Sequence, residues 1–121
     1  MSFRSHFFFV ALIAALPITA EAEFAALVYN DTTNNMGYSW EQPSQEKANE
    51  SAMRGCTSRA RGVGDCVVVI ETQQCFSVFR YKGKDAWATG ATQKEARLNA
   101  KAACEDKFGA KCRRVTYRCA N

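Results

Sequence analysis

The chain has 121 residues, six cysteines, one histidine and a formal net charge of +4. This length allows one domain rather than several. The one histidine, His6, lies near the N-terminus, so we expect no histidine general base, Cys-His nucleophile pair or catalytic zinc site in the rest of the chain.

Residues 1–22 have the features of a secretory signal. Arg4 supplies a positive charge, residues 7–16 form an unbroken apolar run, and Ala20-Glu21-Ala22 is a small-x-small cleavage site. The apolar run is too short for a transmembrane helix, which needs roughly 20 residues. We therefore expect cleavage near Ala22, no transmembrane segment afterwards, and a single domain over residues 23–121 that is secreted or periplasmic.

Six cysteines follow the predicted cleavage site: Cys56, Cys66, Cys75, Cys104, Cys112 and Cys119. An even number of cysteines in an exported chain predicts a disulfide framework. The sequence has no Cys-x-x-Cys motif, so it does not indicate a redox pair or a zinc ribbon. No metal or cofactor is predicted.

The first half of the domain begins with a predicted hairpin, in which residues 24–29 and 36–40 are strands and residues 30–35 are the turn. Ser44 has the position of a helix N-cap. Small residues recur every fourth position along the following helix, which predicts a narrow face that packs closely on a sheet: Ala48, Ala52 and Cys56. Residues 66–70 are strongly β-branched, and we expect them to form a central strand covered on both faces.

The second half has the same order of predicted elements. Residues 76–81 and 86–88 form a hairpin, and Thr92 caps a helix with Glu95 three residues later. The inward face of this helix is again small, and Gly109 ends it: Ala96, Ala100, Ala103 and Cys104. Residues 112–119 form the last strand.

The two halves can be aligned on their helices. Ser44, Ala48, Ala52 and Cys56 each match a similar residue 48 positions later. The sequence therefore predicts an α+β domain, a small disulfide-stapled fold of two repeated strand-strand-helix-strand units with pseudo-twofold symmetry, over residues of about 24–75 and 76–119.

The repeat also suggests how the cysteines pair. Cys56 with Cys66, and Cys104 with Cys112, would join a helix end to the start of the next strand in each copy. Cys75 and Cys119 then remain, at positions that we match to each other, and would tie the two copies together. Other pairings are open because six cysteines allow many connectivities.

Several motifs resemble the bacterial family catalogued as domain of unknown function 4189. They are Gly37-Tyr38-Ser39, residues 44–48, Cys56, Asp65-Cys66-Val67-Val68-Val69, Cys75, Ala86-Trp87-Ala88, residues 92–96, Ala103-Cys104 and residues 112–119. The resemblance implies a small exported bacterial protein with a duplicated fold and no assigned catalytic residues. It also allows an effector-like role, which a shared fold does not carry by itself.

Charge is unevenly distributed along the chain. Residues 23–75 carry a net charge of −3 and residues 92–121 carry +5. The last strand has an arginine-rich segment where the first copy has a valine run, and the following basic residues are predicted to form one partner-binding face: Lys111, Arg113, Arg114 and Arg118. The alternative is a charged edge strand that resists aggregation.

Other residue sets suggest further chemistries with less support. Tyr38, Trp40, Tyr81 and Trp87 could form an aromatic ligand platform, although such residues more often fill cores. The arginines and aromatics also suit nucleic acid, but no recognition motif is present and nucleic acid is not a predicted partner.

Acidic pairs could serve a glycosidase if they faced a cleft: Asp65 with Glu71, or Glu105 with Asp106. A Ser-Lys dyad built on Ser44 or Ser77 is also conceivable, but capping explains Ser44 more simply.

The sequence thus favours an exported binding or interaction module without enzymatic activity, whose partner is a protein or an anionic envelope component. The first alternative is an inhibitor or immunity protein that acts on a periplasmic enzyme. A small hydrolase that uses carboxylates has the least support.

Overall fold

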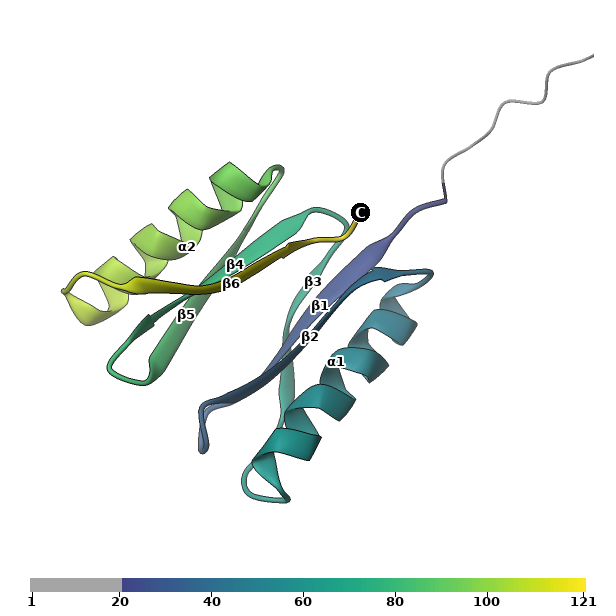
Figure 1. Cartoon of the computed structure of the whole chain (residues 1–121), viewed down its shortest axis with the longest axis horizontal. Helices are drawn as coiled ribbons and strands as arrows, with labels where there is room; N and C mark the ends of the chain where they lie inside the picture. The colour runs from purple at the N-terminus through teal and green to yellow at the C-terminus, as the bar shows by residue number, and fades with distance from the viewer. Residues whose placement is uncertain (1–20) are drawn as a thin grey trace, which may run out of the picture.

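The computed structural model describes residues 21–121, so the predicted secretory signal over residues 1–22 lies almost wholly outside the described residues. The α+β class and the two repeated strand-strand-helix-strand units are confirmed (Figure 1). The elements are β1 (Phe24–Asn30), β2 (Asn35–Gln42), α1 (Gln45–Ala60), β3 (Val67–Thr72), β4 (Cys75–Tyr81), β5 (Lys84–Gly90), α2 (Gln93–Phe108) and β6 (Arg113–Cys119).

Each unit forms its own three-stranded antiparallel sheet. The strand orders are β2-β1-β3 and β5-β4-β6, so β1 and β4 are the central strands. The prediction of a central strand over residues 66–70 is wrong, because β3 lies at a sheet edge and Val67 is 55% exposed. A β-branched run indicates a strand, but its place in the sheet depends on pairing with distant residues.

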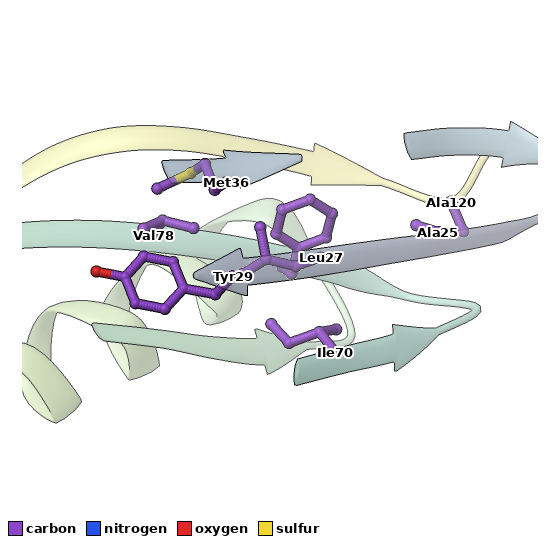
Figure 2. Close-up of a cluster of buried hydrophobic side chains, with 8 residues drawn as sticks. Ala25, Leu27, Tyr29, Met36, Ile70, Val78 and Ala120 are labelled. Carbon is purple, nitrogen blue, oxygen red and sulfur yellow. The ribbon is translucent and has the colours of Figure 1, made fainter. Parts of the chain in front are cut away.

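The two sheets face each other and the two helices cover the outer faces, which gives four layers (Figure 1). Side chains of β1 alternate between these layers, as expected for a strand. Leu27 and Tyr29 point into the layer between the sheets, whereas Ala26 and Val28 pack against α1. Figure 2 shows the layer between the sheets, where Val78 of β4 lies near Leu27 and Tyr29 of β1.

Small residues let the helices lie close to the sheets. The predicted inward residues Ala48, Ala52 and Cys56 of α1, and Ala96, Ala100 and Cys104 of α2, are fully buried. Gly37 of β2 touches α1 so closely that a Cβ there would overlap the backbone of Ala52. The helix ends are also as predicted, because the Ser44 and Thr92 hydroxyls accept hydrogen bonds from the backbone N–H of Lys47 and Glu95.

The helices cover their sheets unequally. α1 packs mainly on β2 and β1, and α2 packs mainly on β5 and β4, so the outer faces of β3 and β6 are largely uncovered. At the layer between the sheets, β2 lies against β6 and β3 lies against β5. A twofold axis between the central strands would produce this arrangement.

The cysteines of the described chain form three disulfides. Cys56 is bonded to Cys66, Cys104 to Cys112, and Cys75 to Cys119, as the repeat suggested. The expected role of the third bond was wrong, however. Cys75 is the first residue of β4 and pairs with Cys119 of β6, so this bond closes the second sheet instead of joining the two units.

The unit boundary explains this correction. The first unit ends with β3 at Thr72, and β3 and β6 begin 46 residues apart. Gln73, not Cys75, therefore corresponds to Cys119. The units are joined by the core between the sheets and by backbone hydrogen bonds to Ala120, which donates to Gln74 and accepts from Glu41.

Candidate functional site

The structure does not bring the four predicted basic residues together on one face. Lys111 lies in the loop before β6, and Arg113 lies opposite Arg80, on the side of the sheet that faces the other unit. Simple alternation would place Arg114 and Arg118 on the same side. A β-bulge at Val115 places them on opposite sides instead. Thr116 pairs with Val78 and Arg114 pairs with the next residue of β4, Phe79, so Val115 is the extra residue of the bulge.

Arg118 belongs to an aromatic cluster at the edge of the layer between the sheets. Its guanidinium carbon lies 4.5 Å from the centre of the Trp40 ring and 5.2 Å from that of Tyr38. Its Nη1 also donates to the backbone oxygen of Tyr117. Arg118 thus connects β6 to β2 through cation–π contacts and is largely engaged within the molecule.

Arg114 projects to the opposite side, where α2 leaves the face of β6 uncovered. There it lines a groove of about 530 Å³ with Arg97, Leu98 and Lys101 from the flank of α2. Phe79 and Cys112 also line the groove, and Phe79 is almost fully buried. We call this site the α2–β6 groove: Phe79, Arg97, Leu98, Lys101, Cys112 and Arg114.

The cations of the α2–β6 groove are poorly neutralised. Lys101 has Glu105 at 4.0 Å, but both side chains are exposed, so this pair contributes little. Neither Arg97 nor Arg114 forms a salt bridge with any carboxylate of residues 21–121. The Arg114 guanidinium carbon lies 5.2 Å from the centre of the Tyr117 ring, which holds the side chain over the groove face of β6.

The groove combines these charges with apolar surface. Leu98 is 52% exposed and supplies apolar surface to the groove. Arginine binds carboxylates and phosphates in a forked geometry, and leucine adds an apolar contact beside it. The groove therefore has the chemistry of a site for an anionic partner that also presents apolar groups.

Sequence reasoning missed Arg97, Leu98 and Lys101 as site residues. A signal was present for Arg97 and Lys101, because each directly follows a buried alanine, Ala96 or Ala100, and so lies at the border of the inward face of the helix. Leu98 lies further round the helix, and its sequence position gave no such signal. Their meeting with Arg114 depends on the bulge in β6 and on the position of α2 over the sheet.

The four aromatic residues of the alternative ligand platform lie in three places. Tyr38 and Trp40 stack on each other, with ring centres 6.0 Å apart. Trp87 contacts Tyr29 across the sheets at 4.8 Å, and Tyr81 packs against Phe108 of α2 at 5.7 Å. No common platform forms.

The suggested acidic pairs do not form a catalytic arrangement either. Asp65 lines a cavity of about 540 Å³ with Asp31, Trp87 and Lys107, and Glu71 is not among its lining residues. Glu105 forms an ion pair with Lys101. Among residues 21–121, no group of three or more potential metal ligands is found, and no helix there is long and apolar enough to cross a membrane.

A buried ion pair lies between the sheets and was not predicted. The fully buried Asp85 carboxylate accepts hydrogen bonds from Nε of Arg80 at 2.7 Å and from Nη2 at 3.0 Å. This contact raises the pKa of Arg80. Burial, and next the nearby Asp85 charge, raise the pKa of Tyr29 to about 12, so its hydroxyl stays protonated and donates to Asn34. The Asp85 carboxylate is thus engaged by Arg80 through both of its oxygens.

Comparisons with known proteins agree with this fold. The family model described as "Domain of unknown function (DUF4189)" matches residues 24–119. The solution NMR structure of Rv1813c from Mycobacterium tuberculosis is similar, with a TM-score of 0.58 and 22% identity over 98% of this chain and 93% of that one. At this identity the likeness concerns the fold alone. No match was found among curated proteins. Because the family model spans both sheets and both helices, the chain belongs to the DUF4189 family.

Proposed function

We propose that this protein is an exported, non-enzymatic binding module that holds an anionic partner in the α2–β6 groove. The observation that carries the proposal is the convergence of Arg97 and Arg114 on one groove without a carboxylate partner among the described residues. Unneutralised cations that point into a common concave surface attract an anionic group from another molecule.

Export is supported by two independent features. Residues 1–22 have the pattern of a secretory signal, and all six cysteines of the chain are paired in disulfides, which persist in oxidising compartments. The proposed location is therefore the periplasm or the exterior of the cell.

The non-enzymatic assignment is supported by the lack of a second histidine in the sequence and by the position of the buried carboxylate. The chain has a single histidine, which belongs to the proposed signal. The carboxylate of Asp85 is fully buried and accepts two hydrogen bonds from Arg80, so it is not accessible to a substrate.

Affinity capture from periplasm or culture medium tests the proposal. The groove variant R97E/K101E/R114E is compared with wild type and with K47E/R54E/K84E, which changes the net charge equally at exposed positions away from the groove and from β6. We expect the groove variant alone to lose its bound partners, by at least about tenfold in recovered amount. Near-ultraviolet circular dichroism confirms that both variants are folded.

Equal loss of captured partners in the two variants would show that net charge alone causes the loss. Unchanged capture by the groove variant would show that the groove does not bind the partner. If the partner is a periplasmic enzyme whose activity falls on binding, the module is an inhibitor or immunity protein.

A further inference from the structure

We infer that the α2–β6 groove takes an extended acidic segment of a protein partner, which pairs with β6 as a fourth strand of the sheet β5-β4-β6. This inference rests on the proposed function and specifies the occupant of its groove. It combines three observations: the open edge of β6, the charges on both of its faces, and the exposed flank of α2.

The edge of β6 is available for pairing. It is the last strand in the order β5-β4-β6, and no strand of residues 21–121 pairs with its other side. β6 contacts β2 near its C-terminal end, through Arg118 and through the backbone of Ala120, whereas the groove lies near Arg114. A strand edge beside a helix is a recurrent site for extended peptides, because the backbone supplies hydrogen bonds and the helix flank contacts alternate side chains.

The charges of β6 indicate the composition of the added strand. β6 contains three arginines and no acidic residue: Arg113, Arg114 and Arg118. Alternate side chains of an added strand would lie on the groove side, near Arg114, Arg97 and Lys101, and the others on the side of Arg113. Carboxylates suit both sides, and one apolar side chain suits the exposed Leu98.

The same distribution argues against a membrane surface as the partner. A lipid surface is bound by clusters of about four to eight basic residues. The groove side of β6 has Arg97, Lys101 and Arg114, which line a concave surface. Here Arg114 and Arg118 lie on opposite sides of β6 because of the bulge at Val115, and Arg118 is engaged with Trp40. A strand that lies along β6 can reach both sides, whereas a planar surface can reach only one.

Fluorescence anisotropy with defined probes tests the inference. The first probe is a fluorescein-labelled peptide, Glu-Glu-Leu-Glu-Glu-Glu. The second is the same peptide with an N-methyl group on every backbone nitrogen, which keeps every charge but removes the backbone donors. The third has lysine in place of glutamate, and the fourth is a phosphatidylglycerol vesicle.

We expect the first peptide to bind wild type at least about tenfold more tightly than the N-methylated and lysine peptides. R114Q should weaken its binding by about tenfold, while the control R54Q, on α1, should not. Amide NMR spectra should show slower hydrogen exchange in β6 on addition of the peptide, a readout that does not depend on the variants.

Three results would overturn the inference. Equal binding of the N-methylated peptide would show that no strand pairing occurs, and binding to vesicles alone would make the partner a lipid surface. Absence of binding to all probes, while the groove variant still loses its captured partners, would reject the strand but leave the proposed function intact. Failure of the capture test would instead reject the groove itself.

Discussion

The two units share a backbone plan but differ in the surface beside the helix and the last strand. Matched along the helices and last strands, the positions of Arg97, Leu98, Lys101 and Arg114 in the second unit are those of Asn49, Glu50, Met53 and Val68 in the first. Met53 and Val68 pack on the core of β1 and α1, which closes the surface with apolar contacts. In the second unit, cations at the matching positions line a groove. The two units thus share a scaffold, and the second has the groove that we propose to bind a partner.

The hairpins of the two units, β1-β2 and β4-β5, also differ in a matched pair of residues. The cross-strand pair Tyr29 and Met36 of the first hairpin corresponds to Arg80 and Asp85 of the second. One unit contributes a phenol and a thioether to the layer between the sheets, and the other contributes an ion pair. The second unit therefore depends more on specific polar contacts and, through Cys75 and Cys119, on a covalent bond that the first unit lacks.

The largest effect is expected from that covalent bond. The double variant C75A/C119A opens a link between residues 44 positions apart, which should lower the free energy of unfolding by about 4 kcal/mol through the entropy of the unfolded chain. The comparison variant C56A/C66A opens a separation of 10 and should lose about 3 kcal/mol. Urea unfolding of the oxidised proteins measures both. The reverse order would show that the bond specific to the second unit does not dominate its stability.

The ion pair is expected to have the next largest effect. D85A leaves the Arg80 guanidinium without its carboxylate and should lower the free energy of unfolding by about 3 kcal/mol. R80Y/D85M introduces the residues of the first hairpin and should be less destabilising than D85A, because no unpaired charge remains. A larger loss for the double variant in urea unfolding would mean that the two hairpins cannot exchange their pairs.

The smallest expected effect is a loss of stability at alkaline pH, which depends on the Tyr29 hydroxyl. Its pKa is raised from 10.0 to about 12 in the folded state, so the unfolded chain loses the phenolic proton first as the pH rises. The stabilisation from this proton is complete below pH 10 and is lost between pH 10 and pH 12, by about 1 to 2 kcal/mol. Between pH 10 and pH 12, the free energy of unfolding of Y29F should fall less than that of wild type. Urea unfolding across this range measures both. The control Y81F changes a tyrosine outside the layer between the sheets, and an equal change in both variants would argue against the role of Tyr29.

Much of the fold was predictable from the sequence because it depends on local features. The hairpins, helix caps, small helix faces and paired cysteines each depend on residues a few positions apart or on the repeat itself. The position of β3 at an edge was not predictable in this way. Its valine run satisfies the preferences of a central strand and of an edge strand alike, and only pairing with β1 decides between them.

The candidate site was less predictable from the sequence than the fold was. The basic character of the last strand was evident from Arg113, Arg114 and Arg118, but their common face was an expectation based on sequence proximity. The bulge at Val115 turns Arg114 away from Arg118 and toward α2. A single extra residue in a strand reverses which side chains share a side, and no local pattern in the sequence marks it.

The sequence by itself determined the duplicated plan of the protein, its six cysteines, the close helix faces and the excess of positive charge in the second unit. These follow from the order and spacing of residues along the chain. Only the tertiary structure decided the sheet order, the role of the bond between Cys75 and Cys119, and the meeting of Arg114 with Arg97 and Lys101. The reason is physical: side chains from different elements meet only after strand register and helix position are set by packing of the whole domain.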